Sequence, residues 1–198
     1  MSLLTATQDD LKSGRGRPLP DRVWRATVQQ AAVTPKPTGT QLETRLTAFR
    51  DRNDVPEIML PDGSMYTPGR RIVFDRQWID QQNAKATEIG QHMIRKLAMS
   101  SGLMAVPENG QRTELDFASF EDFASALVGR DVLVRTKQVR AKTKNAAGVP
   151  VEAFEDAEGN TVIEAETNGV ANTPKFNVEV ADYLLPVGLT LGSSQPTK

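Results

Sequence analysis

Two neighbouring segments near the beginning of the chain alternate apolar and polar residues with a period of two. In residues 40–50 one parity carries mainly apolar or small side chains, namely Leu42, Thr44, Leu46 and Ala48. The other parity carries Gln41, Glu43, Arg45 and Thr47. Such alternation is typical of a strand with one buried and one solvated face. The turn "TPKPTG" joins this segment to residues 22–33, so the pattern predicts an antiparallel β-hairpin.

The next stretch, residues 57–78, is interrupted by turn residues. Pro61-Asp62-Gly63 and Pro68-Gly69 are turn signals, because proline presets φ and glycine accepts a positive φ. Between and after these turns we expect short strands around residues 64–66 and 70–75.

The period then changes to that of a helix. In residues 84–100 apolar side chains recur every four positions, at Ile89, Met93 and Leu97. This spacing predicts an amphipathic helix that is closed near Gly102. A second, shorter helix is expected to begin at Ser119, whose side chain can cap it, and to end at Gly129.

The last third of the chain returns to strand-like residues at 131–144 and 174–186. Residues 145–173 between them are rich in Gly, Asn, Ala and Glu, which favours a long hairpin or excursion. Helices that interrupt a run of antiparallel strands favour an α+β fold. We expect a small antiparallel Greek-key, OB-like β-barrel with one long helix, one short helix and a projecting β-hairpin.

The domain organisation predicted from these patterns is simple. Residues 1–21 form a flexible basic arm, which either is a disordered leader or contacts a phosphate backbone. A single OB-like domain follows at residues 22–186, with the insert or hairpin at 140–173. Residues 187–198 form a polar tail.

Charge is balanced overall but segregated locally. The chain has 24 basic and 25 acidic residues and a net charge of −1, so the whole molecule has no bulk attraction for nucleic acid. Residues 132–145 nevertheless hold five basic residues and no acidic one, whereas residues 151–166 hold acidic residues and no basic one. The basic strip either contacts a polyanion or pairs with the acidic arm that follows it.

The parity of the basic strip changes within it. Arg135 and Lys137 share one side of an ideal strand, and Arg140, Lys142 and Lys144 share the other. Either a bulge occurs near Gln138, or the strand leaves the sheet there and continues as a projecting ribbon.

Several kinds of chemistry lack the residues they need. The sequence has no cysteine, and its one histidine, His92, has no second histidine one helical turn away. It contains no phosphate-binding glycine loop and no constellation of acid, base and nucleophile. We therefore expect no enzyme activity, no metal and no cofactor. Because no long apolar run occurs, we expect a soluble protein in the cytoplasm of the cell that makes it, with no membrane partner.

Nucleic-acid binding is the chemistry with the best support. Single-strand binders combine a basic groove with aromatic side chains on which bases stack. Trp24 lies between two arginines, Trp78 follows Arg76, and Tyr66 precedes Arg70 and Arg71. The parity of Trp24 with Ala26 and Val28 also allows it to be a core residue, so both interpretations stay open.

The order of these segments resembles a known family. The segments are "LPDRVWRATVQQAAV", "GRRIVFDRQWID", "ATEIGQHMIRKLAMSSG", "ALVGRDVLVRTK" and "KFNVEVADYLLP". Over about residues 18–186 the chain is similar to the phage-encoded single-stranded-DNA-binding proteins of replication and recombination modules, a family long catalogued as a domain of unknown function. The resemblance implies an OB-like barrel that coats single strands without sequence preference and without catalysis.

From this resemblance and the charge pattern we expect a non-catalytic viral protein that binds single-stranded DNA during DNA replication or recombination in a bacterial host. The long helix is expected to support homo-oligomerisation, and phage replication or recombination proteins are possible partners. The candidate nucleic-acid-binding residues are Arg22, Trp24, Arg25, Arg45, Tyr66, Arg70, Arg71, Trp78, Arg135, Lys137, Arg140, Lys142 and Lys144. The alternative is a structural or assembly subunit of the virion, such as a capsid, connector or tail component.

Overall fold

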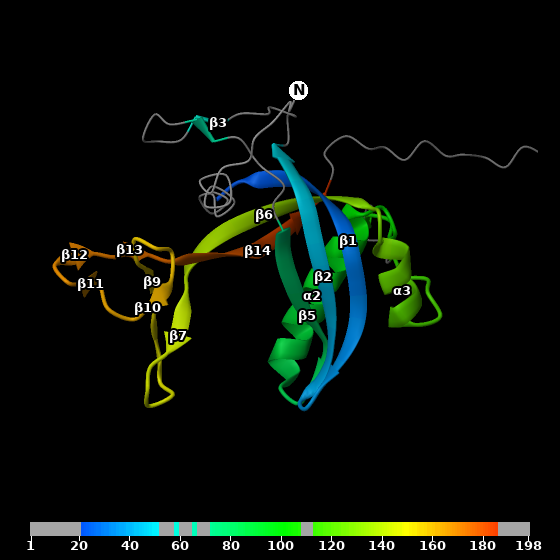
Figure 1. Cartoon of the computed structure of the whole chain (residues 1–198). Helices are drawn as coiled ribbons and strands as arrows, with labels where there is room; N and C mark the ends of the chain where they lie inside the picture. Colours follow the sequence, from blue (N-terminus) through cyan, green and yellow to red (C-terminus); the bar gives the residue numbers. More distant parts are fainter. Residues whose placement is uncertain (1–20, 52–57, 60–64, 67–71, 108–112, 186–198) are drawn as a thin grey trace, which may run out of the picture. The chain divides into compact units, whose positions relative to one another are not determined.

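The computed structural model describes residues 21–51, 58–59, 65–66, 72–107 and 113–185. Within these ranges the chain is mixed, with mostly strands and two helices (Figure 1). It divides into two compact units. The sheet unit comprises Val23–Thr136 and Val180–Lys198, and the hairpin unit comprises Met1–Arg22 and Lys137–Glu179.

The sheet unit is built on a five-stranded antiparallel sheet. Its strands are β1 (Val23–Lys36), β2 (Gly39–Asp51), β5 (Ile72–Gln81), β6 (Asp131–Arg140) and β14 (Phe176–Leu184). The strand order is β14-β6-β1-β2-β5, so β14 and β5 form the edges. The last residues of β6 and the first residues of β14 belong to the hairpin unit. These two strands therefore run from one unit into the other.

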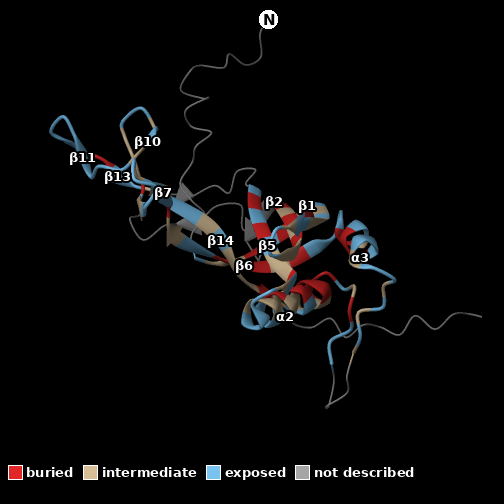
Figure 2. Ribbon diagram, turned by 90° about the horizontal axis from the view of Figure 1, so that it is seen from below, coloured by how far each residue is buried: buried red, intermediate tan, exposed pale blue. Residues whose placement is uncertain are grey.

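The predicted hairpin at the start of the chain is confirmed. β1 and β2 pair antiparallel from Lys36 opposite Gly39 to Trp24 opposite Asp51, with bulges between Arg25 and Thr27 and between Val28 and Gln30. One face of the pair holds buried side chains that continue onto the neighbouring strands: Trp24, Ala26, Val28, Leu42, Leu46, Val73, Val132 and Val134. In Figure 2 the buried parts of the sheet unit lie mainly on the sheet and on the helices.

The predicted long helix is also confirmed, as α2 (Ala84–Ser100). Asn83 caps it by accepting hydrogen bonds from the backbone of Lys85 and Ala86, which satisfies amides that have no partner inside the helix. At Gly90 the helix lies against β5 so closely that a Cβ there would be 2.2 Å from the carbonyl oxygen of Trp78. Glycine at this position therefore permits the packing.

Helix α2 contacts three strands that are not all neighbours in the sheet. The Gln91 side chain donates to the backbone of Ile79 on β5 at 2.9 Å. The Ser100 hydroxyl bonds the backbone of Leu133 on β6, and Lys96 forms an ion pair with Asp182 on β14. The helix thus contacts strands at both edges of the sheet, β5 and β14.

The short helix α3 (Phe120–Leu127) begins where the sequence predicted. The Ser119 hydroxyl accepts a hydrogen bond from the Asp122 backbone at 3.1 Å. The helix ends at Leu127, two residues before the predicted end, and Gly129 follows with a φ of 82°. Gly129 and Arg130 then bond the backbone of Val28, which fixes α3 beside β1.

A buried polar contact joins the two edge strands. The Tyr183 hydroxyl on β14 donates to one carboxylate oxygen of Asp75 on β5 at 2.7 Å. The Gln77 side chain donates to the other oxygen at 2.8 Å. Burial, followed by the charge of Asp75, raises the pKa of Tyr183 well above its ordinary value, so the phenol stays protonated and can donate this bond. The described strands form an open sheet whose edges this contact links.

The turn-rich middle of the chain contains both of the strands that its sequence predicted. β3 (Ile58–Met59) pairs with β4 (Met65–Tyr66), close to the short strand predicted at residues 64–66. The strand predicted at residues 70–75 is the beginning of the longer β5, which continues to Gln81. The predicted arm and tail lie outside the described residues, apart from Asp21 in the arm.

The hairpin unit replaces the predicted single excursion with three small sheets. Its strands are β7 (Lys142–Lys144), β8 (Pro150–Glu152), β9 (Phe154–Glu155), β10 (Thr161–Val162), β11 (Glu166–Thr167), β12 (Val170–Ala171) and β13 (Thr173–Pro174). Ala141, Ala153 and Lys175 meet at its centre. Each donates its backbone amide to the carbonyl of another member of the trio, at 2.9 to 3.0 Å. Both alanines are buried, because three backbone segments leave no room for larger side chains.

Candidate nucleic-acid interface

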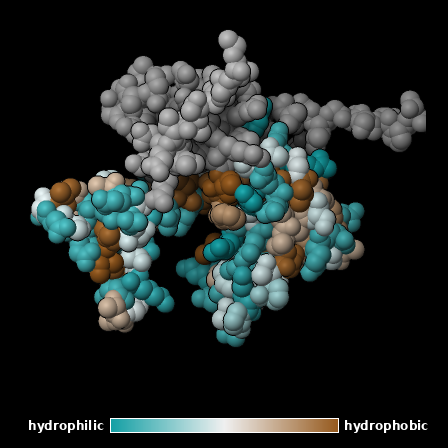
Figure 3. Space-filling view, in the orientation of Figure 1, coloured by the Kyte–Doolittle hydropathy of each residue, from teal (hydrophilic) through white to brown (hydrophobic). Residues whose placement is uncertain are grey.

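The face of the sheet that points away from the buried residues carries polar, charged and aromatic side chains. Strand register places them in three rows that cross β1, β2 and β5. The rows are Gln30, Arg45 and Phe74; Ala32, Glu43 and Arg76; and Thr34, Gln41 and Trp78. We call these nine residues the outer face. In Figure 3, which views the side where β1 and β2 lie in front of α2, hydrophilic and apolar side chains are intermixed.

Phe74 is the most exposed large apolar side chain among the described residues, at 63%. The guanidinium carbon of Arg45 lies 6.0 Å from the centre of its ring. The Nε atom of Arg45 is buried and has no hydrogen-bond partner among the described residues. An exposed ring beside a cation offers a base a stacking surface and its phosphate a positive charge.

Phe74 was absent from the residues selected by sequence. The signal was present, because in "IVFDRQW" Phe74 has the same parity as Arg76 and Trp78. The structure places all three on the same side of β5, with Arg76 between the two aromatic residues. Trp78 is half-buried, and its candidate role remains a prediction.

Glu43 is the acidic residue of the outer face. Its Oε1 atom lies 2.8 Å from the Lys36 ammonium and 3.7 Å from Nε of Arg76. The hydrogen bond from Lys36 is the main cause that lowers the pKa of Glu43, and the charges of Lys36 and Arg76 lower it further, while burial opposes them. This carboxylate is therefore ionised near neutral pH.

The candidate role of Trp24 is wrong. Its side chain is 0% exposed, and its indole nitrogen donates to the Thr136 hydroxyl at 2.9 Å inside the core. A buried indole needs such a partner for its N–H group, and this one comes from a strand more than a hundred residues later. The core interpretation of its parity with Ala26 and Val28 was the correct one.

Two further arginines lie on the same side of the sheet as the outer face. Arg25 on β1 lies opposite Leu133, and Arg135 on β6 lies opposite Val23, and both arginines are exposed. Arg22 is half-buried directly before β1. Arg25, Arg45, Arg76 and Arg135 thus share one side of the sheet unit, although the sequence separates them by up to 110 positions.

The structure divides the basic strip between Thr136 and Lys137, close to the parity change at Gln138, and so separates Arg135 from Lys137. Regular alternation of buried and exposed residues on β6 ends at Thr136, and the hairpin unit begins at Lys137. Lys137 forms an ion pair with Glu179 at 3.6 Å. Lys142 and Lys144 are exposed on β7, where they lie opposite Glu152 and Pro150.

Arg140 is engaged within the hairpin unit. Its guanidinium carbon lies 5.0 Å from the ring centre of Phe154 and 5.3 Å from that of Phe176. Its Nη2 atom donates to Glu152 at 2.6 Å, and this bond is the main reason that the pKa of Glu152 is lowered. For Arg140, the interpretation that the basic strip pairs with the acidic arm is confirmed.

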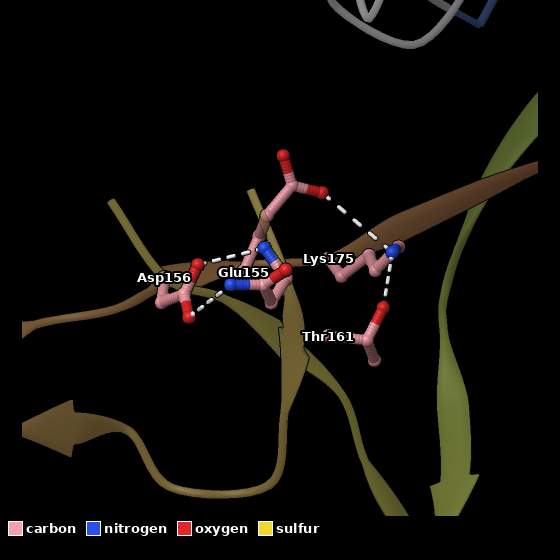
Figure 4. A network of polar contacts seen from close by, with 5 residues as sticks. Glu155, Asp156, Thr161 and Lys175 are labelled. Atoms are coloured by element: carbon pink, nitrogen blue, oxygen red, sulfur yellow. Dashed lines mark hydrogen bonds and ion pairs between the residues drawn. The ribbon is translucent and has the colours of Figure 1, made fainter. Parts of the chain in front are cut away.

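Figure 4 shows how the acidic arm is held by local contacts. Lys175 contacts both the Thr161 hydroxyl and the Glu155 carboxylate. Asp156 accepts hydrogen bonds from the backbone and side chain of Asn160, which lowers its pKa. The hairpin unit has five basic and seven acidic residues over positions 137–179, so this part of it is net acidic.

Three candidate residues cannot be assigned contacts. Tyr66 lies on β4, but its side chain is outside the described part of the chain, and so are Arg70 and Arg71. Their roles stay predictions.

Comparison with protein-family models and with curated proteins gave no match. Over the described ranges, neither helix has the length and apolar character needed to cross a membrane. Those same ranges contain no group of three or more His, Asp or Glu side chains arranged to hold a metal ion.

Proposed function

We propose that this chain is a non-catalytic protein that binds single-stranded DNA without sequence preference, through the outer face of its sheet. The observation that carries the proposal is the exposed ring of Phe74, which has the Arg45 guanidinium 6.0 Å from its centre and Arg76 two residues further along the same side of β5. Bases stack on exposed aromatic rings whatever their identity, because every base has a π-face. The family resemblance points to the same activity in phage replication or recombination.

The arrangement of strands supports an OB-like barrel as the scaffold. The order β6-β1-β2-β5 follows the Greek-key rule, in which the fourth strand returns by a long connection to lie beside the first. The contact between Tyr183 and Asp75 joins the edges of the sheet, as expected of a partly open barrel. OB folds bind oligonucleotides on the face of their second and third strands, which here are β2 and β5.

The arginines on this side of the sheet supply the electrostatic part of the proposal. Arg25, Arg45, Arg76 and Arg135 would neutralise phosphates, and each phosphate neutralised in a single strand contributes about −0.7 to the slope of log affinity against log salt. Binding to oligo-dT should therefore weaken steeply as salt is raised. The net acidic segment 137–179 makes the hairpin unit as a whole a poorer candidate for the main contact.

The decisive variant is Phe74→Ala in the full chain. Since a stacked base contributes about 1–3 kcal/mol, the variant should bind fluorescein-labelled oligo-dT about five- to 150-fold more weakly in fluorescence anisotropy. Ile89→Ala is the matched control, because Ile89 is also an exposed apolar residue but lies on α2. Absence of binding by the unmodified protein at low salt, or affinity that ignores salt, would refute the proposal.

A virion structural or assembly subunit is the second candidate. The observation in its favour is that the hairpin unit exposes apolar side chains beside its turns, with Val149 at 53% and Val170 at 59%. Such residues suit contacts with neighbouring subunits. Size-exclusion chromatography separates the two functions, because a DNA-dependent shift supports the first and self-assembly into large closed particles or rings supports the second.

A further inference from the structure

Two cations of the outer face converge on one oxygen atom. Both the Lys36 ammonium and Nε of Arg76 approach Oε1 of Glu43, from β1 and β5 respectively, while Glu43 stands between them on β2. The side chains are accessible, with Arg76 65% exposed and Glu43 32% exposed. The Glu43 carboxylate thus pairs with the two cations that a phosphate oxygen would otherwise contact.

The position of Glu43 between the aromatic residues would also place it in the path of a bound DNA backbone. Its row lies between the row of Phe74 and the row of Trp78, and Arg45 is two residues away on the same side of β2. Consider a DNA single strand with one base stacked on Phe74 and its backbone running along β5. It would pass the row that contains Glu43. There its phosphate would meet a like charge, which disfavours binding.

We propose that Glu43 is an intramolecular competitor of the nucleic-acid phosphate, which occupies Lys36 and Arg76 while the outer face is empty and lowers its affinity for single strands. This inference rests on the proposed function, since it concerns the regulation of the same face. When a single strand binds, its phosphate replaces the carboxylate as the partner of Arg76 and Lys36. Glu43 then turns to solvent, which its partial exposure allows.

The test is Glu43→Gln, which keeps the size of the side chain and removes its charge. Exposed ion pairs contribute up to about 1 kcal/mol each. The substitution frees Lys36 and Arg76 from their ion pairs with Glu43 and removes the repulsion between Glu43 and the DNA phosphate. It should therefore tighten binding to oligo-dT about three- to tenfold. The matched control is Glu88→Gln on α2, which makes the same change in net charge at an exposed position. It should alter affinity less than about twofold, because an exposed charge that far from the face is screened. Circular dichroism should show that both variants are folded.

The outcomes separate this inference from the proposed function. Tighter binding by Glu43→Gln alone supports it. If the unmodified protein binds and Glu43→Gln binds equally or more weakly, or if both variants tighten alike, the inference is wrong while the proposed function stands. If neither the unmodified protein nor Glu43→Gln binds oligo-dT at low salt, both are wrong.

Discussion

Burial determines which aromatic side chains of this chain can meet a ligand. Trp24 and Phe74 both lie on strands and both have arginines nearby, but Trp24 is wholly enclosed and Phe74 is mostly exposed. The difference follows from the face of the sheet on which each lies, since Trp24 shares its face with Val134 and Phe74 shares its face with Arg45. Of these two rings, Phe74 is therefore the one with a surface open to a ligand.

The bond between Tyr183 and Asp75 gives a second residue-level prediction. Tyr183→Phe removes one hydrogen-bond donor from the buried carboxylate of Asp75, which should lower the free energy of unfolding by about 1–3 kcal/mol. Urea unfolding followed by circular dichroism measures this as a lower midpoint at an unchanged slope.

A double-mutant cycle with Asp75→Asn tests whether the contact itself is responsible. Residues in direct contact show coupling of about 0.5–3 kcal/mol, whereas independent effects add. Strict additivity of the two substitutions would show that the bond does not link the edge strands in solution.

At the scale of elements, α2 is positioned by close backbone packing and polar contacts as well as by its buried side chains Ile94 and Leu97. Gly90 lets the helix lie against β5, and polar contacts from Gln91, Lys96 and Ser100 reach β5, β14 and β6. Because β5 and β14 are the two edges of the sheet, the helix contacts the same pair of strands that the bond between Tyr183 and Asp75 joins.

Gly90→Ala tests this positioning. Alanine favours a helix over glycine by about 1 kcal/mol, yet its Cβ would lie 2.2 Å from the Trp78 carbonyl, and overpacking of this kind costs about 1–3 kcal/mol. We expect a net loss of stability in urea unfolding. Glu88→Ala, at an exposed position of the same helix, should change stability by less than about 0.5 kcal/mol. A Gly90→Ala variant more stable than the unmodified protein would contradict the close packing.

At the scale of the whole molecule, the two units are stabilised differently. The sheet unit has a core of aliphatic and aromatic side chains, whereas the buried residues over positions 137–179 of the hairpin unit are Ala141, Ala153 and Asn172. Its cohesion comes from the backbone trio at its centre and from Arg140 held between Phe154 and Phe176. A cation between two rings replaces the apolar centre that so short a segment cannot build.

Arg140→Ala should therefore loosen the hairpin unit selectively. Loss of two cation–π contacts and one ion pair predicts that proteolytic cleavage within residues 137–179 becomes at least about tenfold faster, while amides of β1 and β2 stay protected from hydrogen exchange. Lys144→Ala, at an exposed position of β7, is the control and should change neither. Equal cleavage of the Arg140→Ala variant and the unmodified protein would show that the stack contributes little.

Local periodicity was sufficient to predict the first β-hairpin and the two helices. Three predictions depended only on residues a few positions apart, and each was confirmed. They are the hairpin from the alternation in residues 40–50, the long helix from apolar residues four positions apart between Ile89 and Leu97, and the short helix from its Ser119 cap. The α+β character followed from the order of those elements. The parity change at Gln138 also marked the place where β6 passes from one unit to the other.

Contacts between distant residues specified the rest. Trp24 forms its hydrogen bond with Thr136, and Tyr183 forms its hydrogen bond with Asp75. Arg140 contacts the ring of Phe176. No short window of sequence contains both members of any of these pairs. The bulges in β1 change which side chains face the core, and their positions depend on pairing with β2 and β6. Periodicity therefore determined the first hairpin and the two helices, while long-range packing determined which aromatic ring is exposed. Exposure depends on what covers a side chain and not on its own neighbours in sequence.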